Sequence, residues 1–130
     1  MILLDTHALI WWLKQSPHLS PKASKAIEAE IGKSRILVST ISVWEICLLI
    51  RSGRLPISCP LDQYLLEMQK LSEFQFVPID FEIAHQSTNL EWTHKDPADR
   101  FIVATAIKSG ATLITKDTKI RKYKHIETIW

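Results

Sequence analysis

The stretch ILLDTHALIWWL, residues 2–13, decides the fold class of this 130-residue chain. It begins with three apolar residues, then Asp5, then an apolar helical pattern that runs from Thr6 to Leu13. Short runs that are apolar on both faces are typical of parallel strands covered by helices on both sides. The stretch therefore predicts a buried strand that leads directly into a helix, with an acidic residue at the junction.

The same alternation continues to the end of the chain. Further strands are expected at residues 36–38, 76–79, 112–115 and 126–130. Helices are expected at residues 6–13, 21–31, 42–51, 61–71, 81–90 and 97–109. Gly53 and Gly110 are placed to end two of these helices. The order predicts one domain over residues 1–130, a three-layer α/β/α sandwich with a central, mainly parallel sheet of four or five strands.

Composition argues against several other classes of protein. Cys47 and Cys59 are too few for a disulfide framework and lack the C-x-x-C spacing of a zinc site, and free thiols suit a reducing cytosol. No apolar run approaches the roughly 20 residues that span a bilayer. The opening segment lacks the basic region of a signal peptide and carries Asp5 in its apolar part. We expect a cytoplasmic protein that makes no membrane contact.

Four acidic residues lie close to the ends of expected strands or at the starts of helices: Asp5, Glu45, Asp99 and Asp117. The carboxyl ends of parallel strands form one edge of a sheet, so these side chains are expected to face one crevice. Crowded carboxylates raise one another's pKa values and destabilise the fold unless a divalent ion is bound. Ligands that are all oxygen favour Mg²⁺ or Mn²⁺ over Zn²⁺ or Cu²⁺.

Two of these acids differ in how well a purely structural role explains them. Ser42 and Glu45 fit the S-x-x-E capping box, in which Glu45 would only bond the backbone N–H of Ser42. Asp5 is harder to explain as a cap, because Thr6 could cap the helix without it. A carboxylate directly after a buried strand is also costly unless it is compensated.

The other acids also have structural interpretations. Asp96 is placed to cap a helix, with Pro97 at its first position and Asp99 in the first turn, where the helix dipole favours an acid. Asp117 is placed as a helix cap as well. For Asp80 we expect only the capping role.

The tryptophans and histidines carry weaker signals. Trp11, Trp12, Trp44 and Trp130 are expected to pack in the core, whereas Trp92 is left open. The five histidines show no paired metal-ligand spacing. His7 and His94 lie nearest the acids in sequence, and a surface or supporting role is expected for them rather than metal ligation.

Four segments of the chain resemble the signature segments of PIN-domain ribonucleases, and most closely those of the VapC-type toxins of bacterial toxin–antitoxin pairs. The segments are ILLDTHALIWW (residues 2–12), SVWEI (42–46), HKDPADRFIVA (94–104) and LITKD (113–117). Each segment alone is a weak signal. All four occur in order and with ordinary spacing along the whole chain, which makes the resemblance strong.

The resemblance implies roles for particular residues. Its catalytic, metal-binding acids match Asp5, Glu45, Asp99 and Asp117. Its small hydroxyl residues, which support the metal and its waters, match Thr6, Ser42 and Thr115. Asp96 is assigned a supporting or capping role. The implied activity is that of an endoribonuclease that hydrolyses RNA phosphodiester bonds with one or two Mg²⁺ or Mn²⁺ ions per active site.

The resemblance also implies partners. A homodimer is expected, together with a small antitoxin protein whose C-terminal segment lies over the active-site groove. The apolar helices at residues 6–13 and 42–50 are expected to face these partners.

Contacts with the RNA substrate are left open between two interpretations. Residues 91–130 carry eight Lys/Arg against five Asp/Glu, with Lys116, Lys119 and Arg121 close to Asp117. These cations either neutralise RNA phosphates or form an ordinary solvated face. Arg100 either contacts the scissile phosphate or braces Asp96.

Three alternatives to a toxin nuclease remain. A phosphatase of the haloacid dehalogenase kind normally has a second acid two residues after the first, and here that position is His7. A non-catalytic RNA-binding or adaptor domain would have no reason to retain all four acids. A PIN-type nuclease of RNA maturation, without an antitoxin, would share the same site.

Overall fold

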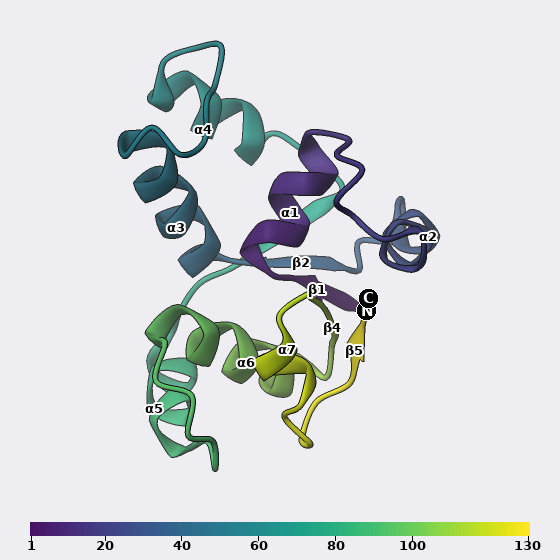
Figure 1. Ribbon diagram of the computed structural model, residues 1–130, viewed down its shortest axis with the longest axis vertical. Coiled ribbons are helices and arrows are strands. Elements are labelled where there is room, and N and C mark those ends of the chain that lie inside the picture. The colour runs from purple at the N-terminus through teal and green to yellow at the C-terminus, as the bar shows by residue number, and fades with distance from the viewer.

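The computed structural model describes all of residues 1–130 and has a five-stranded, entirely parallel sheet at its centre (Figure 1). The strand order is β3-β2-β1-β4-β5. The strands are β1 (Ile2–Leu4), β2 (Ile36–Ser39), β3 (Phe74–Val77), β4 (Thr112–Ile114) and β5 (Thr128–Ile129). Strand β1 is central, and Leu3 pairs with Leu37 on one side and Leu113 on the other. The opening stretch of the chain therefore forms the middle of the fold.

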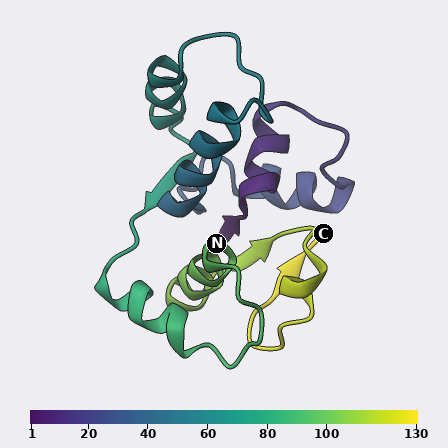
Figure 2. The same cartoon turned by 60° about the vertical axis from the view of Figure 1, so that its left-hand side comes forward.

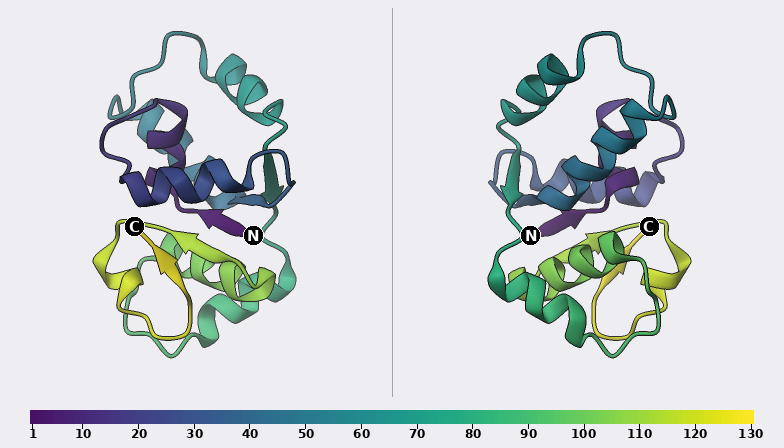
Figure 3. Two further views of the ribbon diagram at one scale, coloured as in Figure 1. Left: turned by 90° about the vertical axis from the view of Figure 1, so that its right-hand side faces the viewer. Right: turned by 90° about the vertical axis from the view of Figure 1, so that its left-hand side faces the viewer.

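Helices cover both faces of this sheet. They are α1 (Thr6–Leu13), α2 (Pro21–Glu30), α3 (Thr40–Arg51), α4 (Leu61–Gln69), α5 (Phe81–Asn89), α6 (Pro97–Ser109) and α7 (Thr118–Arg121). Figure 3 shows α1 and α2 on one side of the sheet and α6 and α7 on the other. Helix α5 packs along α6, away from the sheet (Figure 2). The expected α/β/α sandwich is confirmed.

Alternating strand residues build one apolar core on each face. Ile2 and Leu4 of β1 belong to the core shared with α1, α2 and α3. Leu3 points the other way and packs with Ile102 of α6 and Ile120 of α7. Because successive strand side chains face opposite sides, a three-residue strand contributes to both cores. This two-sided burial explains why the strands are apolar at every position.

Several residues that were predicted to begin or end helices do so in the structure. Asp80 and Asp96 cap α5 and α6, and Ser20 caps α2 with Pro21 at its first position. Gly110 ends α6 in the left-handed conformation, with φ of 62°. Residues without a Cβ adopt that conformation at little cost, which is why glycine is favoured there.

Three expectations about the elements were wrong in detail. Helix α3 begins at Thr40 and is capped by Ser39, so Ser42 lies inside the helix and no capping box forms with Glu45. Strand β3 runs from Phe74 to Val77 instead of over residues 76–79, and it stops before Pro78, which has no N–H to give to the sheet. Asp117 does cap a helix, but that single turn, α7, is missing from the expected helices, since four residues are too short to show a helical period.

None of the seven helices has the length and apolar character needed to cross a membrane.

Candidate active site

The topology brings the four acids to the carboxyl edge of the sheet. Asp5 follows β1 directly, and Asp117 lies three residues beyond the end of β4. Glu45 lies in the second turn of α3, which leaves this edge immediately after β2. Asp99 lies in the first turn of α6, which leads back to the start of β4 and so begins at the same edge. Helix α3 packs against both α1 and α6.

Asp5 is the most deeply placed acid, with only 8% of its surface exposed. Its Oδ1 accepts a hydrogen bond of 2.7 Å from the backbone N–H of Ala8 and so caps α1. Burial raises the pKa of Asp5 and the nearby charge of Asp117 adds to the rise, whereas hydrogen bonds from Thr115 and Ala8 and the charge of His7 oppose it. No lysine or arginine is among the groups that oppose the rise.

Thr115 links Asp5 to Asp117. Its fully buried hydroxyl bonds the Asp5 carboxylate and accepts a 3.0 Å hydrogen bond from the backbone N–H of Asp117. Asp117 in turn caps α7, where its Oδ1 accepts from the N–H groups of Lys119 and Ile120 at 2.8 and 3.0 Å. One hydroxyl thus fixes the relative position of two acids that are 112 residues apart in the sequence.

Thr6 holds Glu45. The Thr6 hydroxyl donates a short hydrogen bond to Glu45 Oε1, and its oxygen lies 3.0 Å from the Ser42 Oγ. Burial is the largest cause that raises the pKa of Glu45, and the charges of Asp99 and Asp96 raise it further. The structure therefore brings Thr6, Ser42 and Glu45 together, although the capping box that could have explained Glu45 is absent.

His94 holds Asp99. The His94 Nε2 lies 2.6 Å from Asp99 Oδ2. Asp96 Oδ1 accepts a 3.0 Å hydrogen bond from the backbone N–H of Asp99, as a helix cap does. Burial raises the pKa of Asp99, the hydrogen bond from His94 opposes the rise, and Asp96 and Asp117 add to it. The four acids thus influence one another across segments that are distant in sequence.

No lysine or arginine forms an ion pair with any of the four acids, and their only ion-pair partner is His94 on Asp99. Glu45, Asp99 and Asp117 each use one oxygen in the hydrogen bonds above, and the second oxygen receives none from the protein. Free carboxylate oxygens in an uncompensated acidic cluster are suitable donors for Mg²⁺ or Mn²⁺. The chemistry of the residues therefore fits such an ion.

The four carboxylates are not arranged around a single metal position. No three His, Cys, Asp or Glu side chains lie close enough to hold one metal ion between them. The reason is local, because each acid is turned toward a partner of its own: Ala8 and Thr115, Thr6, His94, and the first N–H groups of α7. Side chains of this set must therefore turn away from these partners before three of them share an ion.

Arg100 has a different position from either that was expected. Its guanidinium donates four hydrogen bonds of 2.8 to 3.2 Å to the backbone carbonyls of Ser87, Leu90, Trp92 and His94. None of these bonds reaches Asp96. With four of five donors engaged by the end of α5 and the loop that follows it, Arg100 is a brace for residues 87–94, and we do not retain it as a substrate contact.

Two features were missed by sequence reasoning. The contact between His94 and Asp99 has no spacing signal, since it depends on how the loop before α6 folds. Trp44 was expected in the core, yet 55% of it is exposed. The helical period contains this information, because the buried residues of α3 are Ser42 and Ile46, and Trp44 falls on the opposite face.

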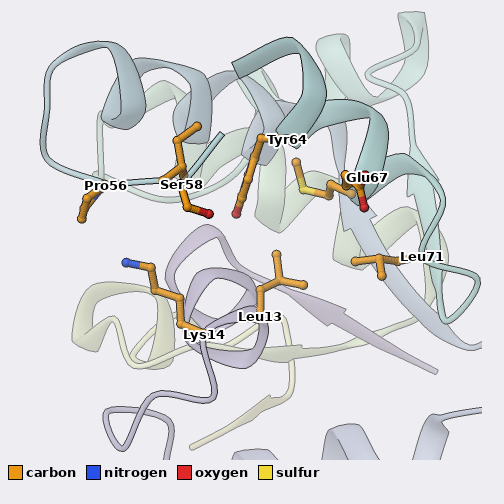
Figure 4. A pocket seen from close by; sticks show the side chains of 9 residues that line it. Leu13, Lys14, Pro56, Ser58, Tyr64, Glu67 and Leu71 are labelled. Atoms are coloured by element: carbon orange, nitrogen blue, oxygen red, sulfur yellow. The ribbon is translucent and has the colours of Figure 1, made fainter. Parts of the chain in front are cut away.

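A cavity of about 550 Å³ between the end of α1 and α4 is separate from the acids. Figure 4 shows Leu13 and Lys14 on one side of it and Tyr64, Glu67 and Leu71 on the other. None of the four acids lines this cavity. It is therefore not the candidate active site.

Comparison with known proteins relates this chain to one protein family. Residues 2–126 match the PIN domain. The chain is 35% identical to Ribonuclease VapC22 of Mycobacterium tuberculosis (strain ATCC 25618 / H37Rv), over 99% of this chain and 98% of that protein. A toxin–antitoxin complex from Klebsiella pneumoniae contains a chain with 25% identity and a TM-score of 0.68, over 97% of this chain and 95% of that chain. FitAcB from Neisseria gonorrhoeae has the same fold, with 23% identity and a TM-score of 0.71, over 98% of this chain and 96% of that chain. With a match over nearly its whole length, the chain belongs to the PIN domain family.

Proposed function

We propose that this protein is a Mg²⁺- or Mn²⁺-dependent endoribonuclease that hydrolyses RNA phosphodiester bonds, and that it is the toxin of a VapBC-type toxin–antitoxin pair. One observation carries the proposal. Asp5, Glu45, Asp99 and Asp117 come from four separate segments, lie at the carboxyl edge of one sheet, and form no ion pair with a lysine or arginine.

The relatives support the same activity. The VapC22 protein is named a ribonuclease and is similar along the full length of this chain. The Klebsiella pneumoniae structure is described as a toxin–antitoxin complex. These names supply the substrate class and the kind of partner that the acids alone do not specify.

In the proposed mechanism the four acids hold the ions. When bound, a divalent ion supplies positive charge to the phosphate and promotes ionisation of the attacking water. Thr6 and His94 orient Glu45 and Asp99, and Thr115 keeps Asp5 beside Asp117. The raised pKa values of Asp5, Glu45 and Asp99 mean that ion binding and loss of protons are coupled at this site.

Other parts of the chain provide the remaining proposed contacts. Lys116, Lys119 and Arg121 are exposed beside Asp117, where they are placed to neutralise RNA phosphates. We propose a homodimer and a small antitoxin as protein partners. The proposed place of action is the cytoplasm, where the free thiols of Cys47 and Cys59 stay reduced.

The proposal is tested by incubating purified protein with total cellular RNA and Mg²⁺, Mn²⁺ or a chelator, and mapping new RNA ends by sequencing. Cleavage is expected with either ion and not with the chelator. Asp99→Asn should abolish it without unfolding the protein. Asp80→Asn should not, because Asp80 caps α5 and pairs with Lys108 in the last turn of α6, whereas Asp99 lies in the first turn. Cleavage in the chelator, or full cleavage by Asp99→Asn, would contradict the assignment.

Growth separates a toxin from a nuclease of RNA maturation. Expression of the wild type alone should slow growth, and expression of Asp99→Asn should not. Equal growth defects would show that the effect is unrelated to the proposed site. Absence of any growth effect, with cleavage intact in the test tube, would favour RNA maturation.

A further inference from the structure

Another cavity, the α2 cavity, has a volume of about 610 Å³ and is lined by the end of α1, by α2 and by residues that precede β3. Half of its ten lining residues are hydrophobic, and two are glutamates, Glu28 of α2 and Glu73 just before β3. None of the four acids of the candidate active site lines it. Its volume lies within the roughly 300–1,000 Å³ of sites that bind small molecules. The α2 cavity is therefore separate from the proposed active site and large enough for a whole small molecule.

The two glutamates of the α2 cavity have no positive partner in the protein. Neither Glu28 nor Glu73 forms an ion pair, and none of the ten lining residues is a lysine, an arginine or a histidine. The Oε1 of Glu28 accepts only a 3.2 Å hydrogen bond from the Ser24 hydroxyl. By contrast, the cavity between α1 and α4 contains Lys14 as well as Glu67. The α2 cavity therefore carries negative charge that no residue of its lining offsets.

The end of α1 adds two further features that favour a cation. Trp12 and Leu13 line the cavity from the last turn of this helix, and Gln15 and Ser16 line it from the residues that follow. The carboxyl end of a helix carries a partial negative charge, which attracts cations. Trp12 is partly buried, and its ring stacks on no other aromatic ring and on no cation. An indole attracts an ammonium ion through its ring face and methylene groups through its apolar surface.

The lining favours an organic cation over a bare metal ion. A divalent ion needs several oxygen ligands close together, and no three His, Cys, Asp or Glu side chains lie close enough to hold one. Leu19 and Leu71, together with Trp12, instead offer apolar surface to a hydrocarbon chain. Glu28 and Glu73 come from different elements of the fold. A flexible chain that carries more than one ammonium group can therefore pair with both carboxylates.

We propose that the α2 cavity binds a linear polyamine, whose ammonium groups pair with Glu28 and Glu73 and whose methylene groups pack against Trp12. A polyamine is favoured over a lysine side chain of a protein partner, because a lysine carries one ammonium group and the cavity presents two glutamates. The inference goes beyond the proposed function, since it assigns a second ligand to a different part of the chain. It requires no metal ion, RNA or antitoxin.

Isothermal titration of the full chain with spermidine, in chelator and without RNA, tests the inference. The wild type should bind the amine, and Glu28→Gln and Glu73→Gln should each weaken binding by about tenfold or more, as expected for the loss of a charged hydrogen bond. Trp12→Leu should weaken binding by about 2- to 30-fold, the range for loss of a cation–π contact, and Trp12→Phe should recover part of the affinity. Butylamine, which has a single ammonium group, should bind more weakly than spermidine.

Two controls locate the binding, because the acids of the proposed active site also attract cations. Glu67→Gln/Glu82→Gln removes two exposed negative charges from α4 and α5, which is the same change in net charge as in Glu28→Gln/Glu73→Gln. This control variant should bind spermidine as the wild type does. Nuclear Overhauser contacts between the methylene protons of spermidine and the indole N–H of Trp12 should place the ligand in the cavity. Circular dichroism melts identify any variant that fails to fold.

Equal spermidine affinity in the two double variants would overturn the inference, because binding would then depend on net charge or on other acids. Absence of binding by the wild type, or Overhauser contacts that do not include Trp12, would overturn it as well. A trilysine peptide that binds more tightly than spermidine, and only when Glu28 and Glu73 are intact, would assign the cavity to a basic protein segment instead. None of these outcomes depends on RNA cleavage, so failure of the proposed nuclease is distinguished from failure of this inference.

Discussion

The Nε2 of His94 lies 2.6 Å from the Oδ2 of Asp99, which is the shortest link between the loop before α6 and the acidic site. Other contacts hold the His94 ring and backbone in place. Its ring packs 4.7 Å from Trp92, which packs 5.1 Å from Tyr123, and its backbone carbonyl accepts from Arg100. A histidine that is held in this way sets the direction of the Asp99 carboxylate.

Removing this histidine should reduce metal-dependent cleavage. We expect His94→Ala to lose about 10- to 100-fold in activity or metal affinity, as is typical when a group that orients a metal ligand is removed. His94→Gln keeps a hydrogen-bond donor and should therefore cleave RNA faster than His94→Ala, although more slowly than the wild type. The measurement is the cleavage rate as a function of Mn²⁺ concentration. His85→Ala, in an exposed position on α5, is the control, and equal rates for the two alanine variants would refute the role.

Asp5→Asn should raise stability at neutral pH in the absence of metal while it abolishes cleavage. Burial holds the pKa of Asp5 above its ordinary value of 3.8, so the folded state favours the protonated form. The cost of ionising Asp5 is absent below that ordinary value, grows as the pH rises above it, and is complete once the pH exceeds the raised folded pKa. The asparagine keeps an oxygen to accept from Ala8 and carries no charge.

Thermal unfolding as a function of pH, in chelator, checks this prediction. The melting temperature of Asp5→Asn should exceed that of the wild type at neutral pH, and the two should converge on the acid side. A lower melting temperature for Asp5→Asn at neutral pH would contradict the account of Asp5 as an uncompensated buried acid.

Thr115→Val should uncouple Asp5 from Asp117. The valine has a similar shape but cannot bond the Asp5 carboxylate or accept from the Asp117 N–H. Cleavage should fall by about tenfold or more. Thr115→Ser keeps the hydroxyl and should stay close to the wild type. If valine and serine variants cleave RNA equally well, the hydroxyl has no part in arranging the site.

Arg100→Lys should destabilise the fold by about 2–4 kcal/mol, because hydrogen bonds to charged groups contribute about 1.5–3 kcal/mol each and are not additive. A lysine cannot reproduce the planar guanidinium that reaches four carbonyls. Urea unfolding measures the change. Arg121→Ala, at an exposed position on α7, should change the free energy of unfolding by less than about 0.5 kcal/mol. Comparable effects of the two variants would refute the bracing role.

Much of the fold was predictable because its signals are local. A strand that is apolar on both faces, such as Ile2–Leu4, must be covered on both sides, and parallel strands bring their carboxyl ends to one edge. That reasoning is enough to bring Asp5, Glu45, Asp99 and Asp117 to one edge of the sheet, but not to arrange three of them around one ion. Capping residues such as Asp96 and Gly110 marked helix ends for equally local reasons.

Other features depend on tertiary packing, and the sequence did not reveal them. Ser42 and Ser39 are equally good caps by type, and only the end of β2 decides that Ser39 starts the helix. The partners of Arg100 are carbonyls, which carry no sequence signal. The exposure of Trp44 could have been inferred from the period of α3, because Ser42 and Ile46 define the buried face.

The central claim is that the four acids bind a shared divalent ion, and calorimetric titration of the purified protein with Mn²⁺ tests it most directly. The wild type should take up one or two ions per active site, and Asp99→Asn should take up none while it melts as a folded protein. No uptake by the wild type, or equal uptake by both proteins, would contradict the claim.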